Sequence, residues 1–494
     1  MSHVDDRARV LVVGAGLAGL RCAELLQRSG VTVELHEASE RLGGRCWSAH
    51  GLADGIVAEH GGELIAPDHR HVAALAKELG LQLEDRMAAT PPELRSGAIV
   101  FEGRRVGPGE GTAEMARALA VLVQEAERIA DLRPGRAGEE AHRLDEQTVN
   151  QWLDENVEDG TRSLVGRAIK TAMEMAYGIP ADRISGAALA FEFGMDPGSG
   201  RDPANEHDLG GDVFGSLGEA GAGSLLQRHV HGGNDLLVHG LAERLDQATI
   251  RLGSALTSLH ADEDGVVGRF GDSTELRAEA AVLAIPLPAL REVDLEGAHL
   301  SERRRGAIGE LSSMGQNTKL LIGLDRPPSE LPSWPGFVGD LDEPPIVIWD
   351  TSSGQAGPGG VLTVYTASVV FSASEAHAEP SPAVIEEALG RIERLVPGVR
   401  EHFNGRAWLD SWPHDPWSRG SYLGFGPGQY TRYWGLLGEP EDRIHFAGEH
   451  TSTFGQGYLD GAIESGERAA RDVLDDLGLP LQEPGNTEAE GRTA

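Results

Sequence analysis

Residues 9–19 read RVLVVGAGLAG, an unbroken apolar run followed directly by a glycine-rich turn. Such a run is typical of a parallel strand that is buried on both faces of its sheet. After the turn, apolar residues from Leu17 to Leu26 recur at helical spacing until Gly30 ends the predicted helix. The stretch therefore predicts strand, turn and helix at the start of an α/β, Rossmann-like domain.

Three glycines, Gly14, Gly16 and Gly19, stand at GxGxxG spacing in this turn. In such a motif the first glycine permits a tight turn, the second lets the backbone approach a pyrophosphate, and the third allows the helix to pack closely on the strand. Glu37 ends the next predicted strand, about 20 residues on, where a carboxylate accepts hydrogen bonds from ribose hydroxyls. We therefore predict a dinucleotide site. This motif alone does not decide whether the dinucleotide is NAD or FAD.

The composition narrows the class of protein. The 494 residues suffice for two domains or one large composite, and the 66 glycines and 40% apolar residues indicate a globular, loop-rich protein. The formal charge of −35 argues against a nucleic-acid partner, because a polyanion is bound through clustered Lys and Arg. The same charge would concentrate small cations such as amines, although a surface adapted for solubility is the simpler explanation.

The low number of cysteines and the first residues of the sequence predict a cytoplasmic location. Cys22 and Cys46 are the two cysteines of the chain, too few for a disulfide framework or a zinc ligand set, and this suits a reducing environment. The first ten residues, MSHVDDRARV, lack the order of a signal peptide, and no run of 18 apolar residues occurs. We expect a cytoplasmic protein without a membrane partner and, since none of the 18 histidines has a convincing ligand set, without a metal.

The rest of the chain predicts mixed helices and strands. We expect a helix over 66–87, mostly helical structure over 112–177 with a loop at 131–142, and a connecting loop or lid at 194–223, where Gly, Pro and Asp dominate. Further predicted elements are a helix at 232–245, short strands over 250–285, strands at 318–324 and 360–368, a helix at 382–396, a strand within 443–451 and a long C-terminal helix that ends at Gly478.

A second motif decides between the two nucleotides. The stretch ASERLGGRCWS, residues 38–48, places Arg45 directly after a glycine pair. It resembles the extended signature of FAD-dependent oxidoreductases, which implies FAD as the cofactor and Arg45 at its pyrophosphate. Cys46 beside it could carry a covalent flavin link, but a small buried thiol is the more common fate of such a residue.

The stretch IHFAGEHTSTFGQGYLDGAIESGERAA, residues 444–470, resembles the flavin-containing amine oxidase family, which includes monoamine, polyamine and L-amino-acid oxidases. The resemblance runs from Val10 to about Leu474 and implies a discontinuous architecture. We expect an FAD-binding domain built from 8–88, 228–296 and 415–480, a mixed α+β substrate-binding domain from 89–227 and 297–414 with a helical insertion, and a disordered tail at 481–494. The resemblance leaves a homodimer open.

The resemblance also implies roles for single residues. Further cofactor contacts are expected at Gly61 and Gly62 beneath the flavin, Leu256 at the adenine, Trp412 against the ring, and Gly448, Glu449 and Leu459 at the C-terminal motif. Tyr422 and Tyr458 match an aromatic pair that sandwiches the amine, although plain core packing explains a tyrosine as well.

Lys319 is one of only three lysines among 43 basic residues. It lies in the strand predicted at 318–324, which reads TKLLIGL. Members of the family carry a lysine on a strand of the substrate domain, where it holds a water against flavin N5. The resemblance therefore implies a catalytic role for Lys319, and the alternative is an edge lysine that guards a sheet against aggregation.

Two departures from the family pattern refine the expectation. Ser421 stands where covalent monoamine oxidases carry a cysteine, so the FAD is expected to be noncovalent. Leu64 stands where L-amino-acid oxidases carry an arginine that pairs with the substrate carboxylate. Without that arginine a carboxylate would be held poorly, so we expect an amine substrate rather than an amino acid. Glu63 beside it would then pair with a second cationic group of the substrate or face solvent.

These features lead to one functional hypothesis. An amine is oxidised to an imine by hydride transfer to flavin N5, the imine hydrolyses to an aldehyde or ketone, and oxygen reoxidises the flavin with release of hydrogen peroxide. The alternatives are an L-amino-acid oxidase with another carboxylate anchor such as Arg95 or Arg419, a flavin desaturase acting on C–C bonds, and a noncatalytic FAD-binding protein.

Overall fold

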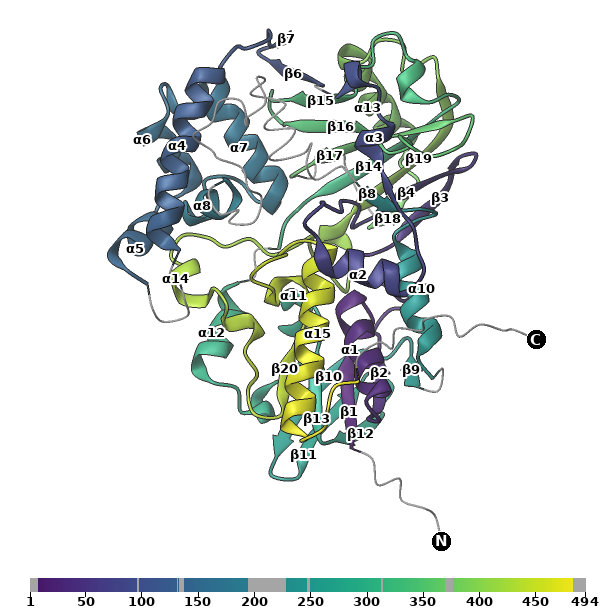
Figure 1. The fold of residues 1–494 in the computed structure, drawn as a ribbon, viewed down its shortest axis with the longest axis vertical. Coiled ribbons are helices and arrows are strands. Elements are labelled where there is room, and N and C mark those ends of the chain that lie inside the picture. Colours follow the sequence, from purple (N-terminus) through teal and green to yellow (C-terminus); the bar gives the residue numbers. More distant parts are fainter. Residues whose placement is uncertain are drawn as a thin grey trace, which may run out of the picture.

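The computed structural model describes residues 8–95, 97–130, 132, 137–193, 228–246, 249–311, 314–368 and 376–482. The molecule is elongated, with an eight-stranded sheet in the upper half of Figure 1 and a five-stranded sheet in the lower half. The loop predicted at 194–223 lies outside the described residues, and so does the tail predicted at 481–494 apart from its first two residues. In the part that is described, no helix has both the length and the apolar character needed to cross a membrane.

The five-stranded sheet is parallel throughout and has the order β20-β13-β1-β2-β9. Its strands come from distant parts of the chain: β1 (Arg9–Val13), β2 (Thr32–His36), β9 (Ile250–Arg251), β13 (Ala280–Leu283) and β20 (Ile444–Phe446). The first motif supplies the central strand, because β1 pairs with β13 on one side and β2 on the other. The α/β class predicted from that motif is confirmed.

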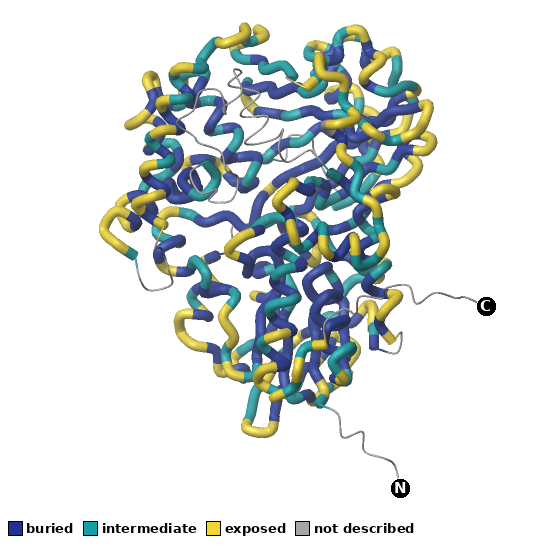
Figure 2. The backbone as a smooth tube through the Cα atoms, viewed as in Figure 1, coloured by how far each residue is buried: buried dark blue, intermediate teal, exposed yellow. Residues whose placement is uncertain are grey.

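Both faces of this sheet are covered, as an all-parallel sheet requires. Val10 and Val12 face α1 (Leu17–Arg28), α10 (Asp235–Arg244) and α15 (Leu459–Asp476). Leu11 and Val13 face a three-stranded antiparallel sheet of β10 (Leu256–Asp262), β11 (Gly265–Phe270) and β12 (Glu275–Ala278). Figure 2 shows the result, with dark blue strands inside the lower half and exposed segments along its rim.

The eight-stranded sheet has the order β18-β19-β14-β17-β16-β15-β6-β7 and is antiparallel except between β15 and β6. Its strands are β6 (Ala98–Phe101), β7 (Arg104–Arg105), β14 (Thr318–Leu324), β15 (Phe337–Asp340), β16 (Ile346–Asp350), β17 (Gly360–Thr366), β18 (His377–Ala378) and β19 (Phe403–Ser411). One face packs on α13 (Pro382–Leu395), and the other contacts the hairpin of β3 (Ser48–Ala53) and β4 (Ile56–Glu59).

A group of helices flanks the eight-stranded sheet at the upper left of Figure 1. It consists of α4 (Thr112–Ile129), α5 (Glu139–Glu146), α6 (Val149–Asn156), α7 (Leu164–Tyr177) and α8 (Ala187–Phe193). The remaining helices are α2 (Arg70–Glu78), α3 (Arg86–Ala89), α11 (Leu287–Leu290), α12 (Glu302–Glu310) and α14 (Tyr430–Tyr433). The strands of the five-stranded sheet all lie within the proposed FAD-binding domain, and those of the eight-stranded sheet all lie within the proposed substrate-binding domain. The domain boundaries remain a proposal.

Two predicted elements differ from the structure. The helix predicted over 66–87 ends at Glu78, and Gly80 with φ of 72° turns the chain away. The segment beyond it forms β5 (Leu83–Asp85), which pairs antiparallel with β8 (Arg228–Val230) across a large sequence separation. The loop predicted at 131–142 is also shorter, since α5 begins at Glu139.

Helices α1 and α15 run side by side in Figure 1, although they lie at opposite ends of the sequence. Their close approach depends on Gly466 of α15, where an added Cβ would lie 2.3 Å from the carbonyl oxygen of Ala18. Backbone atoms cannot move aside for a methyl group as a flexible side chain can. The two ends of the chain are therefore joined by a contact that only glycine permits.

This contact predicts opposite effects for two helical glycines. Gly466→Ala should destabilise the protein by about 1 to 3 kcal/mol, because it overpacks the α1–α15 interface. Gly309→Ala, on α12 where no atom lies within 4 Å of the new Cβ, should instead stabilise it by about 0.5 to 1 kcal/mol through helix propensity. Thermal unfolding of both variants measures the difference, and equal shifts would contradict the proposed packing.

Candidate active site

One cavity of about 740 Å³ runs between the two sheets, from the glycine turn after β1 to a group of tyrosines. Every predicted site residue except Gly19 lines it: Gly14, Gly16, Glu37, Arg45, Gly61, Gly62, Leu256, Lys319, Trp412, Tyr422, Gly448, Glu449, Tyr458 and Leu459. Residues more than 400 positions apart in the sequence therefore share one wall.

The glycine turn has the geometry expected of a nucleotide site. Gly14 has φ of 99°, and an added Cβ would lie 2.5 Å from the carbonyl oxygen of Ala284. At Gly19, which packs behind the turn, a Cβ would lie 1.9 Å from the Gly14 oxygen. At Gly16 a Cβ would meet only the Gly43 oxygen, at 3.9 Å, so the space beside it belongs to the cavity. The turn leaves room for a phosphate and thus fits a dinucleotide.

Glu37 lies at the same end of the cavity, just beyond β2. Its carboxylate accepts hydrogen bonds from the backbone N–H groups of Ala15 at 2.7 Å and Ser39 at 2.9 Å. An ionised carboxylate has about four acceptor positions, so a ribose hydroxyl can be added to these bonds. Leu256, the first residue of β10, lines the same cavity.

Arg45 and Glu449 connect the N-terminal and C-terminal motifs. Their side chains form an ion pair with 2.9 Å between Nη1 and Oε1, and Arg45 also donates to the carbonyl oxygen of Ser421. The second oxygen of Glu449 accepts from the N–H of Gly457 at 2.8 Å. Gly448 precedes this acid with φ of 122°, a conformation that glycine adopts readily.

Gly61 and Gly62 keep the chain close to its neighbours in the middle of the cavity. An added Cβ at Gly61 would lie 2.0 Å from the oxygen of Arg45 and 2.9 Å from the ring of Trp412. One at Gly62 would lie 2.5 Å from the side chain of Leu459, the first residue of α15. Side chains at these positions would push the cavity walls apart.

Trp412 contacts two histidines, His60 and His377, that are both bonded to the buried Asp410. Its Nε1 donates to the carbonyl oxygen of His60 at 3.2 Å, and the ring of His377 meets it edge-on at 4.6 Å. Asp410, fully buried, bonds to both histidines at 3.0 and 2.8 Å. Burial lowers the pKa of His377, but its hydrogen bonds to Asp410 and Asp415 outweigh this and raise it. The Trp412 ring is therefore fixed in orientation.

Tyr422 and Tyr458 both lie on the cavity wall, half-buried. The Tyr422 hydroxyl donates to the carbonyl oxygen of Met175 at 2.9 Å and contacts the hydroxyl of Tyr365. Tyr458 precedes α15, and its ring lies 5.1 Å from that of His69. Burial raises the pKa of both tyrosines, so both are neutral near pH 7. Tyr422 thus has a satisfied hydroxyl, as core packing requires, and still faces the cavity.

Lys319 is central in its sheet. β14 lies between β19 and β17, which excludes the alternative of an edge lysine. Because strand residues alternate, Leu320 faces α13 while Lys319 faces the cavity. Its ammonium donates to the carbonyl oxygens of Glu59 and Gly61, both at 2.9 Å, and to Oε2 of Glu63 at 2.8 Å. An ammonium has three donors, so the water expected on Lys319 would have to replace one of these acceptors.

The structure contradicts one of the two roles expected for Glu63, that of facing solvent. It is 3% exposed, so it does not face solvent, and its partners are cations of the chain itself. Besides Lys319, it accepts from Arg86 of α3 and from Nε1 of Trp349 in β16, each at 2.9 Å. Burial raises the pKa of the Glu63 carboxyl, but the charges of Lys319 and Arg86 overcome this and bring it to about 2.

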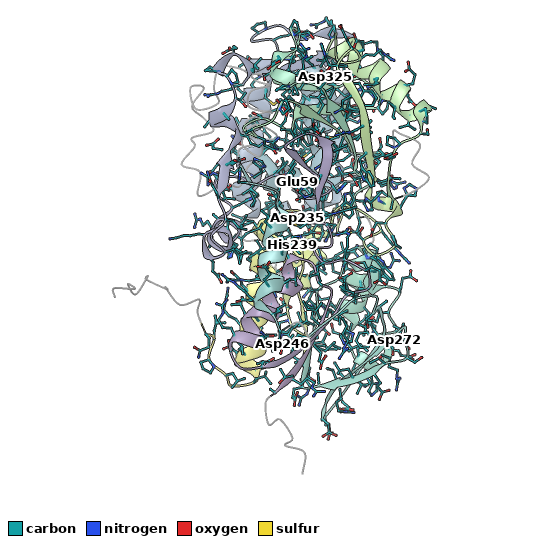
Figure 3. All side chains as sticks on the ribbon, turned by 90° about the vertical axis from the view of Figure 1, so that its right-hand side faces the viewer. Glu59, Asp235, His239, Asp246, Asp272 and Asp325 are labelled. Atoms are coloured by element: carbon teal, nitrogen blue, oxygen red, sulfur yellow. The ribbon has the colours of Figure 1, made fainter. Side chains whose placement is uncertain are left out.

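A second buried carboxyl, that of Glu59, lies near Glu63 and Lys319. Lys319 and Arg86 face one ionised carboxylate, Glu63. Glu59, at the end of β4, lies near mid-height of the molecule in Figure 3, and burial raises its pKa to about 8 despite hydrogen bonds from Asn234 and Ser48. The pKa of Glu59 therefore lies well above that of Glu63, and Glu59 balances the charges of Lys319 and Arg86 less than Glu63 does.

Several functional candidates were not predicted from the sequence: Arg86, Tyr177, Glu192, Trp349 and Tyr365, of which all but Arg86 line the cavity. Tyr365 is the direct partner of Lys319 in the pairing of β14 with β17. Aligning TKLLIGL with GVLTVYTAS as neighbouring strands would have found it. The other four are brought to the site by long-range packing.

Arg95 and Arg419, the alternative carboxylate anchors, and Cys46, the candidate for a covalent flavin link, do not have the surroundings that those roles require. Arg95 is exposed and lies outside this cavity, with its Nε bonded to the oxygen of Thr90. Arg419 borders the cavity but pairs with Glu292 at 2.6 Å. Cys46 is buried, and burial raises its pKa well above the ordinary value of a thiol. Within the described residues, no group of His, Cys, Asp and Glu could hold a metal ion.

Comparison with known proteins agrees with this geometry. A family model described as flavin containing amine oxidoreductase matches residues 17–474. The protein is therefore a flavin-dependent oxidoreductase that acts on amines. It belongs to the flavin-containing amine oxidoreductase family, as the C-terminal motif predicted.

Individual relatives match almost the whole chain. The probable flavin-containing monoamine oxidase A of Dictyostelium discoideum is 25% identical over 95% of this chain and 98% of its own. The (S)-6-hydroxynicotine oxidase of Paenarthrobacter nicotinovorans is 27% identical over 94% of this chain and 99% of its own. Cyclohexylamine oxidase from Brevibacterium oxydans IH-35A shares the fold, with a TM-score of 0.79, 21% identity and coverage of 96% and 100%.

The Glu63 ion pairs predict a large stability effect. Glu63→Gln leaves Lys319 and Arg86 buried without their carboxylate, which should cost on the order of 3 to 5 kcal/mol. Glu386→Gln, which removes an exposed partner of Arg400, is the matched control and should hardly change the melting temperature. Differential scanning calorimetry checks both, and equal melting temperatures for the two variants would refute the assigned role.

Proposed function

We propose that this protein is an FAD-dependent amine oxidase that binds its cofactor noncovalently, converts an amine to an imine and passes the electrons to oxygen, giving hydrogen peroxide. The observation that carries the proposal is the continuity of the cavity. A nucleotide-type glycine turn with Glu37 lines one end, and Lys319, Trp412 and the tyrosines line the other. A dinucleotide that carries its reactive ring at the far end fits this arrangement.

The cofactor would be held by residues of both motifs. Gly14, Gly16 and Glu37 would hold its nucleotide end, and the Arg45–Glu449 pair would lie at its pyrophosphate. Ser421 offers no thiol, and the thiol of Cys46 is directed to the carbonyl oxygen of Asn234 at 3.4 Å, which supports noncovalent binding. When bound, the flavin supplies the two-electron oxidation of the amine and the return of the electrons to oxygen.

The protein's own contribution is to position the amine and to exclude water. Tyr422 and Tyr458 would place an amine between their rings, which favours alignment of its α C–H bond. Trp412, fixed through His60 and His377, would limit movement of the ring that accepts the electrons. The positive charge of Lys319 would stabilise the negative charge that accompanies electron uptake.

The substrate class is tested by anaerobic bleaching of the bound flavin. We expect primary or secondary amines to bleach the flavin and L-amino acids to fail, because neither Arg95 nor Arg419 offers a free guanidinium inside the cavity. Aerobic turnover should release hydrogen peroxide, and acid precipitation should release the FAD into solution.

Each alternative has its own outcome in this experiment. Faster bleaching by L-amino acids would support an L-amino-acid oxidase. Bleaching by a polyene or porphyrinogen, with none by amines, would support a desaturase. A protein that is yellow but bleached by no substrate would be a noncatalytic FAD-binding protein.

Lys319 has a separate test. Lys319→Met should keep FAD bound, since the Arg45–Glu449 pair and the glycine turn are intact, but should slow flavin reduction or reoxidation strongly. Stopped-flow absorbance separates these two half-reactions. The matched control is Lys77→Met, which removes an exposed lysine of α2 and should change neither rate. Unaltered half-reactions in the Lys319 variant would overturn its catalytic role.

A further inference from the structure

Glu192 stands out among the acidic residues of the cavity. It lies on α8, near the C-terminal end of that helix, and its half-buried side chain lines the cavity. Burial raises the pKa of the neighbouring tyrosine hydroxyls, and the charge of Glu192 adds to the shift in each of four: Tyr177, Tyr422, Tyr430 and Tyr458. The carboxyl group therefore lies at the tyrosine end of the cavity, which is the end proposed to bind the amine.

The other acidic side chains on the cavity wall are already bonded. They and their partners are Glu37 with Ala15 and Ser39, Glu63 with Lys319 and Arg86, Glu292 with Arg419, Asp415 with Ser418, and Glu449 with Arg45. Among the residues that the structure describes, no hydrogen bond or ion pair reaches the Glu192 carboxyl. Burial raises its pKa to about 7, and no cation in the described part of the chain offsets that rise.

Packing holds Glu192 in this position. The preceding residue, Phe191, stacks on Tyr430 with 5.0 Å between ring centres and contacts Trp434 at 4.7 Å. Helix α8 also packs against α4 and α5. The side chain therefore projects from an anchored helix, and an unpartnered carboxyl held inside a cavity is costly unless a ligand supplies the donor.

We propose that Glu192 binds a second cationic group of the substrate, so that the preferred substrates are diamines, with one nitrogen oxidised between Tyr422 and Tyr458 and the other paired with Glu192. This inference rests on the proposed amine oxidase function and adds a substrate class to it. A protonated amine supplies the N–H donors that the carboxylate lacks, and such a charge-assisted pair is strong when it is shielded from water.

The test uses the flavin-loaded full-length protein and two matched series of probes, the α,ω-diamines of three to six carbons and the corresponding monoamines. For the wild type, kcat/KM should be higher for the best diamine than for the monoamine of equal length. Glu192→Gln should lower kcat/KM for that diamine by about tenfold to a hundredfold and leave the monoamine within about threefold. Glu146→Gln, an exposed acid of α5, removes the same charge from the surface and should change neither value.

A second variant separates recognition from folding. Glu192→Asp keeps the charge but draws it back by one methylene, so the preferred diamine should become about one carbon longer. A purely structural role for Glu192 would not shift the preferred chain length, and this readout decides the matter if the Gln variant fails to hold flavin.

The possible failures are distinguishable. A wild type that prefers monoamines, or a Glu192→Gln variant that slows monoamines and diamines by the same factor, would overturn the inference, and the second result would assign Glu192 to the reacting nitrogen. If no amine of either series bleaches the flavin, the proposed oxidase function fails and the inference falls with it.

Discussion

Glu63 is a carboxylate removed from water and placed between two cations, and both halves of the molecule meet at it. Lys319 reaches it from the eight-stranded sheet and Arg86 from α3, while Asn234 at the start of α10 donates to the backbone oxygens of Gly62 and Glu63 at 3.0 and 3.1 Å. The cost of burying these charges is offset only while all partners are in place. The segment that lines the middle of the cavity is therefore fixed from both sides.

Much of the fold was predictable because local pattern and final environment agree. The strand at 318–324 is apolar in sequence and is buried along its whole length, and the glycine turn after β1 has the conformation that its spacing implies. The helix predicted over 66–87 was too long for a physical reason. Its last part forms β5, and the strand that pairs with it lies about 145 residues further along the chain, where no local pattern points back to it.

Some residues of the site were likewise predictable from local motifs, and others were not. Gly14, Gly16, Arg45 and Glu449 belong to compact motifs, so their meeting at one cavity could be expected from sequence. The partners of Glu63 could not, because ion pairing depends on tertiary contacts that spacing does not encode. Glu192 was missed for another reason, since it lies in an apolar helical stretch without a motif and becomes notable only when its lack of a partner is seen.

The order of strands in the five-stranded sheet also bears on how the protein is made. β20 and the cavity wall from Gly448 to Leu459 are synthesised about 430 residues after β1. A nascent chain on the ribosome thus exposes an unfinished sheet edge and an open cavity while the residues between these elements are made. The cavity is complete only once the segment up to Leu459 has left the ribosome, so a flavin that binds there would be enclosed late in the folding of this domain.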